Sequence, residues 1–266
     1  MGSEYMKPLR GLLRALRIAT LHQGVSSLCR ICRSWQNDVL CENCVTTFAQ
    51  PEPRCPTCAL PQPSGALCVE CLQRPPSLDA CLAAVHYQYP WSHCITQFKF
   101  QDDTGLARAL AQLIRHAPWV EPALEAADAV IPMPLSNARL RDRGFNQSWL
   151  LARHLAPDKL DTFILQRQSD GLHQVGASRL ARQEQVHSSF WVPPESMARV
   201  YARRLVLVDD VMTTGATLFE AARTLRAAGA CHVTAVVLAR TDLPPLQPSV
   251  RHAGQWQDVQ HRPGSP

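Results

Sequence analysis

The chain lacks the long apolar run that a membrane-spanning helix needs. None of its uninterrupted apolar stretches approaches the roughly 20 residues required to cross a bilayer. Near the N-terminus, arginines interrupt the leucines of "KPLRGLLRALRIATL" and break up any apolar core of a signal peptide. We therefore expect a cytoplasmic protein with no membrane span. The leucines of this basic segment form one helical stripe, for which packing on the rest of the protein is favoured over binding to a membrane surface.

Acidic residues are fewer than basic ones, with 22 Asp and Glu against 27 Lys and Arg and a formal net charge of +5. The excess lies between Leu135 and Leu205, which enclose eleven basic and six acidic residues. A local basic excess is typical of a site for an anionic ligand or for nucleic acid. Arginines scattered over an ordinary soluble surface would give the same count.

Cysteine, in contrast, is abundant. Eleven cysteines without a signal peptide favour metal binding over disulfides. Eight of them form four Cys-x2-Cys pairs, and the gap is eight residues between the first two pairs and nine between the last two: Cys29 and Cys32, Cys41 and Cys44, Cys55 and Cys58, Cys68 and Cys71. The other three, Cys81, Cys94 and Cys231, have largely apolar sequence neighbours, so we expect them to be buried.

Each Cys-x2-Cys pair can place two thiolates on one side of a tight turn, and two pairs complete a tetrahedral Zn²⁺ site. The nearly equal gaps predict two successive four-cysteine sites with a structural role. Zinc would supply the folding energy that this short, proline-rich segment cannot obtain from a core of its own. Redox chemistry is a less favoured alternative, because four pairs occur in tandem. An interleaved pairing of the four Cys-x2-Cys turns is also compatible with the spacing.

The residues after the cysteine segment predict an α/β architecture. Apolar patterns indicate strands at 80–89, 128–135, 162–167, 205–208 and 232–240, and helices at 92–100, 105–117, 146–156 and 216–228. A polar loop with a short helix is expected at 173–190. The alternation of strands and helices predicts a mostly parallel sheet. We expect a basic amphipathic segment at 1–28, a double zinc-ribbon module at 29–75, the α/β domain at 80–241 and a disordered tail at 242–266.

Two acidic residues and a glycine turn follow the strand at 205–208, in "RLVLVDDVMTTGATL". Open α/β sheets bind ligands at the carboxyl ends of parallel strands. Asp209 and Asp210 would accept hydrogen bonds from ribose hydroxyls. The following helix N-terminus would offer N–H donors to a phosphate through Thr213, Thr214, Gly215, Ala216 and Thr217. An ordinary capped turn is the alternative, but the complete strand–DDxxTTGxT–helix string is far more specific than either part.

The stretch "VLVDDVMTTGAT" resembles the phosphoribosyl pyrophosphate (PRPP)-binding loop of type I phosphoribosyltransferases. Together with the four upstream Cys-x2-Cys pairs, it resembles the ComF/GntX family of competence and DNA-utilisation proteins. "AVIPMPLSNARLRDRGFNQSWLLARHLA" (129–156) is similar to the family's Pro-x-Pro…Arg-x-Arg-Gly-Phe-Asn-Gln-Ser segment, and "ITQFKF" (95–100) to its Lys-Phe motif. The likeness covers roughly residues 29–241.

The resemblance implies a type I phosphoribosyltransferase-like domain that binds PRPP with Mg²⁺. Asp209 and Asp210 would hold the ribose, residues 213–217 the 5′-phosphate, and the forked guanidinium of Arg143 the pyrophosphate. These two acids and Arg143 are the catalytic candidates. Gly144 would allow a tight turn, and Asn146 and Gln147 would bring amides to the start of a helix. Lys99 enters through the Lys-Phe motif alone.

One stretch departs from the family. Glu184 and Gln185 stand where such proteins have an Arg-Asn pair, in the region that forms the mobile loop of type I phosphoribosyltransferases. This departure counts against transfer and not against PRPP binding. Three alternatives are a nucleobase-salvage enzyme, a PRPP-sensing regulator, and an interaction protein whose ribbons bind single-stranded DNA or a helicase. No segment suggests a hood that reads a base, and Trp35 and Phe48 are the only ribbon aromatics available for base stacking.

Overall fold

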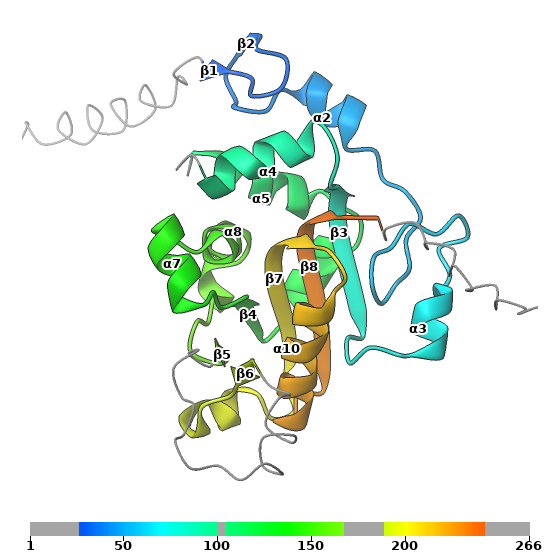
Figure 1. The fold of residues 1–266 in the computed structure, drawn as a ribbon, viewed down its shortest axis with the longest axis vertical. Helices are drawn as coiled ribbons and strands as arrows, with labels where there is room; N and C mark the ends of the chain where they lie inside the picture. The colour runs from blue at the N-terminus through cyan, green and yellow to red at the C-terminus, as the bar shows by residue number, and fades with distance from the viewer. Residues whose placement is uncertain (1–26, 101–104, 168–188, 243–266) are drawn as a thin grey trace, which may run out of the picture.

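The computed structural model describes residues 27–100, 105–167 and 189–242. Its centre is a four-stranded sheet in the order β3-β8-β7-β4 (Figure 1). The strands are β3 (Ala80–His86), β4 (Ala129–Pro132), β7 (Arg204–Met212) and β8 (His232–Arg240). All three neighbouring pairs run parallel, which confirms the predicted mostly parallel sheet.

The two central strands are apolar because helices cover both faces of the sheet. Leu205 and Leu207 belong to a core cluster with α10 (Ala216–Ala227), which lies in front of the sheet in Figure 1. Val206 and Val208 belong to a second cluster on the other face. That cluster contains residues of α4 (Trp91–Phe100), α5 (Leu106–Arg115), α6 (Val120–Ala126) and α8 (Gln147–Leu155).

The two halves of the cysteine segment contact different parts of the sheet domain. The first half contains β1 (Ser27–Leu28), β2 (Trp35–Gln36) and α2 (Glu42–Phe48), and it lies over α4 (Figure 1). Its link to that helix includes a 2.8 Å hydrogen bond from Trp91 Nε1 to the Phe48 carbonyl. The second half contains α3 (Val69–Gln73) and lies beside β3, where the Cys81 N–H donates to the Pro56 carbonyl at 2.7 Å.

Several boundaries differ from the sequence prediction. The strand expected at 205–208 continues to Met212, because its pairing with β8 runs on through Asp209. The strand expected at 162–167 contains only β5 (Gln166–Arg167), which pairs antiparallel with β6 (Phe190–Trp191) outside the main sheet. Side chains bind the preceding backbone instead of a neighbouring strand: Asp161 accepts from the Phe163 N–H at 2.8 Å, and the Ser196 hydroxyl donates to the Phe163 carbonyl at 3.1 Å.

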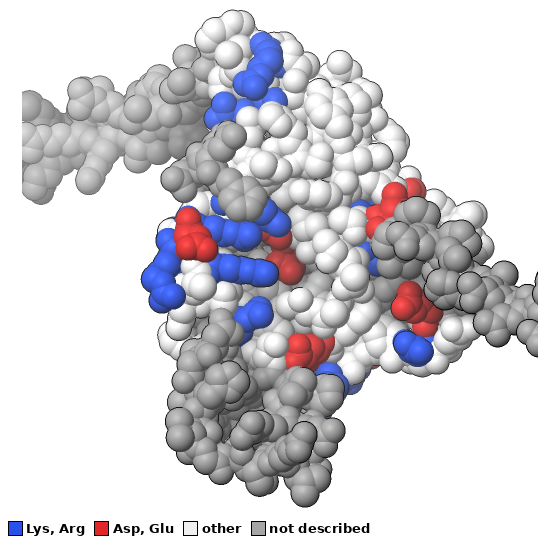
Figure 2. Space-filling model, in the orientation of Figure 1, with Lys and Arg blue, Asp and Glu red and all other residues white. Residues whose placement is uncertain are grey.

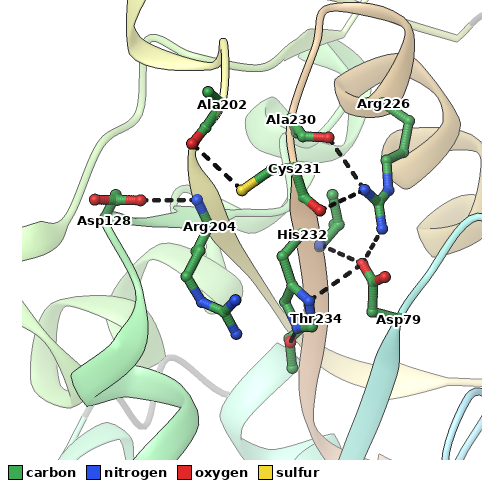
Figure 3. Close-up of polar contacts among 10 residues, drawn as sticks. Asp79, Asp128, Ala202, Arg204, Arg226, Ala230, Cys231, His232 and Thr234 are labelled. Atoms are coloured by element: carbon green, nitrogen blue, oxygen red, sulfur yellow. Dashed lines mark hydrogen bonds and ion pairs between the residues drawn. The ribbon is translucent and has the colours of Figure 1, made fainter.

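Other features were not predicted. They are the two-residue strands β1, β2 and β6, the short helices α2, α3 and α6, the helix α7 (Asn137–Arg143), and the 3₁₀ turns η2 (Pro157–Lys159) and η4 (Pro194–Arg199). The predicted burial holds for Cys81 and Cys94 but is wrong for Cys231, which is exposed. Cys231 lies in the turn that enters β8, at the amino edge of the sheet, and its thiol contacts the Ala202 carbonyl at 3.3 Å (Figure 3).

A network around Asp79 closes this amino edge of the sheet (Figure 3). The Asp79 carboxylate accepts from the Val233 N–H at 2.7 Å and pairs with Arg226 of α10. The Arg226 guanidinium also donates to the carbonyls of Ala230 and Cys231, at 3.1 and 2.7 Å. These contacts fix the entry to β8 at the edge opposite to the one where the sequence predicts a ligand.

Four expectations fall on residues that the structure does not describe. They are the N-terminal leucine stripe, the loop and short helix at 173–190 (apart from its last two residues), the Glu184-Gln185 departure and the tail after Asp242. Within the described ranges, no helix combines the length and the apolar character that a membrane crossing requires.

Candidate functional site

The two predicted acids lie at the carboxyl end of β7, where side chains from two helices meet them. The Asp209 carboxylate accepts from the Ser148 hydroxyl of α8 at 2.8 Å and from the Asp210 N–H at 2.9 Å. The Asp210 side chain, which is 9% exposed, pairs through its carboxylate with Lys99 Nζ of α4 at 2.9 Å. The structure therefore brings Lys99 into the acidic site, a position that the sequence supported only by resemblance.

Asp209 has an altered protonation equilibrium. Burial of its carboxyl among protein atoms, and next the charge of the adjacent Asp210, raise its pKa to about 7, whereas the hydrogen bond from Ser148 and the charge of Lys99 act in the opposite direction. A ligand that brings hydroxyl donors or a cation to this carboxylate would favour its ionised form. Without a ligand, the ionised Asp209 carboxylate therefore lowers the stability of the folded chain. A ligand with hydroxyl donors or a cation would be stabilised by the same charge.

This cost predicts a stabilising substitution. The pKa of Asp209 rises from 3.8 to about 7 in the folded chain, so the free energy of unfolding should fall as the pH rises through this window. Asp209→Asn keeps the oxygen that accepts from Ser148 and removes the titration. We expect the ligand-free variant to match the wild type only below pH 3.8 and to gain a further advantage of about 2–4 kcal/mol in free energy of unfolding between pH 5 and pH 8.

Urea unfolding at several pH values measures this effect. Asp128→Asn is the matched control with the opposite sign, because the backbone N–H of Arg204 and the charge of Arg203 lower the pKa of Asp128. The control should lose stability at neutral pH. Equal pH slopes for the wild type and Asp209→Asn would contradict the assignment of the raised pKa.

The loop between β7 and α10 presents the N-terminus of a twelve-residue helix at the same edge of the sheet. Gly215 precedes the helix with φ +84°, and a Cβ at this position would collide with Met212 and come within 2.8 Å of the Phe219 ring. A side chain is therefore excluded on both conformational and steric grounds. Gly215 also provides no capping side chain, so the first N–H groups of α10 can meet an anion.

The threonines of this loop are consistent with a phosphate site. Thr213, Thr214 and Thr217 are exposed, as is Ala216. The Thr214 hydroxyl accepts from the Ala216 N–H at 3.4 Å, which is a long contact that an incoming phosphate oxygen could replace. Hydroxyl and N–H donors therefore gather at the end of β7, directly after the acid pair.

The arginine-rich helix α7 (Asn137–Arg143) follows β4, the strand that pairs with β7. Arg143 is the last residue of α7, and Gly144 ends that helix with φ +72°. Arg143 Nη1 donates to Gln147 Oε1 at 3.2 Å, and Gln147 directly precedes the Ser148 that binds Asp209. Arg139 and Arg141 of α7 are exposed. Figure 2 shows basic side chains gathered over this helix with acidic atoms beside them.

The two predicted amides have different environments. The Asn146 side chain caps α8 by accepting from the Trp149 N–H at 3.2 Å, and its amide donates to the Met133 carbonyl at 3.0 Å. Both ends of this amide therefore serve the loop itself. Gln147 is 1% exposed, and its Nε2 has no hydrogen-bond partner among the described residues. A buried amide donor without a partner is unusual in a folded protein and fits a position beside a ligand-binding site.

The eight cysteines of the Cys-x2-Cys pairs form two groups whose four sulfurs lie within 4.8 Å of one another. The first cluster contains Cys29, Cys32, Cys41 and Cys44, and the second cluster contains Cys55, Cys58, Cys68 and Cys71. The pairing is therefore successive, as the near-equal gaps predict, and not interleaved. All eight thiols are free, and Cys32 is the exposed member of the set.

The surroundings of both clusters fit a tetrahedral thiolate site for a metal such as zinc. In the first, Cys29 Sγ accepts from the Cys41 N–H and Cys41 Sγ accepts from the Cys44 N–H, both at 3.4 Å. The second repeats this pattern at equivalent positions, at 3.4 and 3.5 Å. These donors favour thiolates, whereas burial raises the pKa of Cys44 and Cys58. A cation would resolve this conflict by holding the four sulfurs ionised.

Comparisons with known proteins agree with this geometry. The phosphoribosyl transferase domain family matches residues 151–249, which include the loop after β7. DNA utilization protein YhgH of Salmonella typhimurium is 31% identical over 225 residues, covering 82% of this chain and 97% of that protein. Competence protein F of Haemophilus influenzae is 35% identical over 181 residues, covering 65% of this chain and 78% of that protein. The chain belongs to the ComF family.

A third relative, competence protein ComFC of Bacillus subtilis, is 29% identical over 194 residues, covering 70% of this chain and 78% of that protein. The phosphoribosyl transferase match begins after Ser148, so Lys99 and the arginine-rich helix α7 lie outside it. In this ComF-family chain, the structure adds Ser148 to the site. Ser148 is the last letter of "RGFNQS", and its place in that motif was the available sequence signal for its role.

Proposed function

We propose that this ComF-family protein binds PRPP with Mg²⁺ at the carboxyl end of β7 and takes part in the utilisation of DNA. The ligand proposal depends above all on one observation. The acid pair of β7 is followed after a short loop by Gly215 and the N-terminus of α10. Carboxylates that can accept from hydroxyl groups therefore lie close in sequence to N–H groups that can donate to a phosphate. The role in DNA utilisation follows the names of its relatives.

In this proposal, Asp209 and Asp210 accept from the ribose hydroxyls, and residues 213–217 donate to the 5′-phosphate. Arg143 holds the pyrophosphate, supported by Gly144 and the adjacent Gln147. Lys99 balances the charge of Asp210 until the ligand binds, consistent with their 2.9 Å contact. The Mg²⁺ ion that accompanies PRPP would neutralise part of the pyrophosphate charge.

We propose further that each four-cysteine cluster binds one structural Zn²⁺. Neither cluster has an open coordination position, because four thiolates complete the tetrahedron. The free state of all eleven cysteines supports a reducing compartment such as the cytoplasm.

The residues around the first cluster favour a binding partner that carries phosphates and bases. Arg30, Arg33, Tyr89 and His93 line a hollow of about 280 Å³ beside this cluster. Tyr89 is 70% exposed, and Trp35 on β2 is 71% exposed. Arginines next to exposed aromatic rings suit single-stranded DNA, since bases stack on the rings and phosphates bind the cations. A helicase surface is the alternative partner, and titration with a labelled oligothymidylate distinguishes the two.

We expect the protein to bind PRPP but not to transfer its phosphoribosyl group to free nucleobases at the rate of a salvage enzyme. Calorimetry should show that the wild-type protein binds PRPP with Mg²⁺ and binds ribose 5-phosphate more weakly. Pyrophosphate release with adenine, guanine, hypoxanthine, uracil or orotate should stay far below the ~10 s⁻¹ of an ordinary enzyme. The reason lies in the sequence: Glu184 stands where the family has an Arg-Asn pair, and an acid in this segment would oppose the departure of a negatively charged pyrophosphate.

Two outcomes would contradict these expectations. A wild-type protein that binds no PRPP in the presence of Mg²⁺ would remove the proposed ligand. Rapid pyrophosphate release with one of the five bases would instead identify a phosphoribosyltransferase of nucleobase salvage.

A further inference from the structure

One buried arginine connects the second four-cysteine cluster with the loop after β7. Arg240 is the last residue of β8 and is 2% exposed. A buried arginine usually pairs with a carboxylate. Arg240 has no acidic partner among the described residues, and its guanidinium instead donates to backbone carbonyls. Such an arrangement is costly to bury, so its acceptors indicate what it holds in place.

The acceptors belong to three separate segments. Nε donates to the carbonyl of Cys58 at 2.8 Å, within the second cluster. Nη1 donates to the carbonyls of Met212, at 3.3 Å, and Thr213, in the loop after β7. The two hydrogens of Nη1 are shared with a third acceptor, the Thr241 carbonyl at 2.5 Å, just after β8. Arg240 therefore joins the Cys58 turn of the second cluster, the loop after β7 (213–217, here called the phosphate loop) and the end of β8.

The orientation of the loop peptides follows from these contacts. In a trans peptide, the carbonyl and the N–H of the next residue point in opposite directions. Arg240 holds the carbonyls of Met212 and Thr213 towards the protein interior. The N–H groups of Thr213 and Thr214 then point away from Arg240, in the direction required to meet an anion outside the loop. The arginine thus acts on a ligand through the backbone and without touching it.

Further contacts reinforce the same connection. The Cys81 thiol contacts the Met212 sulfur at 3.4 Å, and the Cys81 N–H binds the Pro56 carbonyl in the second cluster. The Thr241 N–H donates to the Met212 carbonyl at 3.1 Å. The four cysteines of the second cluster also belong to the same hydrophobic core as Met212. The first cluster differs, because Cys29, Cys41 and Cys44 form a separate small cluster.

We propose that Arg240 is a positioning residue. Anchored on the second four-cysteine cluster, it fixes the orientation of the peptide groups in the phosphate loop. Metal in the second cluster then supports ligand binding at the loop, and metal in the first does not. The inference rests on the proposed function for the identity of the ligand, but the coupling between cluster and loop can be measured without it.

The test compares Arg240→Met and Arg240→Lys with the wild-type protein. Arg240→Met should weaken PRPP binding at least tenfold while zinc remains bound at two per chain. Arg240→Lys keeps the charge and loses the fork, so its affinity should be intermediate. In the ligand-free protein, hydrogen exchange of the Thr213 and Thr214 amides should be faster in both variants. Arg226→Met is the matched control, because Arg226 also binds two carbonyls but at the opposite edge of the sheet (Figure 3).

Thermodynamic linkage gives a second measurement that needs no substitution. If metal in the second cluster supports the loop, a ligand at the loop must support that metal by the same factor. Saturating PRPP should therefore raise the zinc affinity of the second cluster of the wild-type protein, measured by equilibrium competition with a chelator, and leave that of the first unchanged. In Arg240→Lys this gain in zinc affinity should be smaller.

The outcomes separate the inference from the proposed function. Unchanged loop exchange in both Arg240 variants would overturn the inference, as would a loss of affinity in Arg226→Met equal to that in Arg240→Met. A wild-type protein that binds no PRPP would remove the proposed function, and the loop exchange would still decide whether Arg240 positions the loop.

Discussion

Replacing both Asp209 and Asp210 with alanine is expected to weaken PRPP binding by about 3–6 kcal/mol, or roughly two to four orders of magnitude in Kd. The two carboxylates are the proposed acceptors for the ribose hydroxyls, and each charged hydrogen bond contributes about 1.5–3 kcal/mol. The double variant should remain folded, because removal of two carboxylates that repel each other offsets the loss of the ion pair between Asp210 and Lys99. Calorimetry with PRPP and Mg²⁺ measures the change.

Asp128→Ala provides the control for this experiment. Asp128 lies just before β4, at the opposite edge of the sheet, and binds Arg203 and the backbone of Arg204. This variant should bind PRPP as the wild type does. If the double variant binds PRPP with the affinity of the wild-type protein, the acid pair does not hold the ribose.

Removal of the proposed zinc ions should have the largest effect on stability. Structural zinc contributes about 10–16 kcal/mol in zinc-finger peptides, which equals or exceeds the total stability of a typical domain. Elemental analysis should count two zinc ions per chain. A thiol-reactive reagent should release them in two steps, with the first cluster leading because Cys32 is its exposed member.

The two steps should differ in their structural consequences. Loss of the first zinc should unfold residues around the first cluster and leave the main thermal transition in place, since its buried cysteines form a small cluster of their own and only Leu40 among the described residues of this half is a buried member of a sheet core. Loss of the second should abolish the cooperative transition, because its cysteines lie in the same buried cluster as Leu205 and Leu207. Cys32→Ser serves as the variant for the first step alone. A single zinc per chain, or disulfides in place of zinc, would contradict the two-site interpretation.

The sequence predicted the parallel sheet because β7 and β8 are apolar enough to be buried on both faces. It also predicted the successive cysteine clusters, since a short gap between two Cys-x2-Cys pairs brings them together locally. It gave the wrong end for β7, because Asp209 is a poor strand residue that parallel pairing to β8 nevertheless keeps extended. Helix α7 was missed because its polar, arginine-rich sequence has no apolar face, and none of its residues is buried.

The parts of the site that depend on long-range contacts were less accessible. The contact between Lys99 and Asp210 joins α4 with β7, and no local pattern in the chain reports it. Ser148 was visible only as a letter in a motif. Arg240 was visible as a charge at the end of the apolar run "HVTAVVLAR", but its role depends on Cys58, which is far away in the sequence.

The order of the strands in the sheet has a consequence for synthesis of the chain. Ala80 at the start of β3 pairs with Thr234 of β8, so more than half of the chain lies between these partners. β4 likewise cannot pair until β7 has been synthesised. Each cysteine cluster, in contrast, closes within a short stretch. On the ribosome, both clusters can therefore form while β3 and β4 are still unpaired, and the nascent chain must protect these two apolar strands until its last third has emerged.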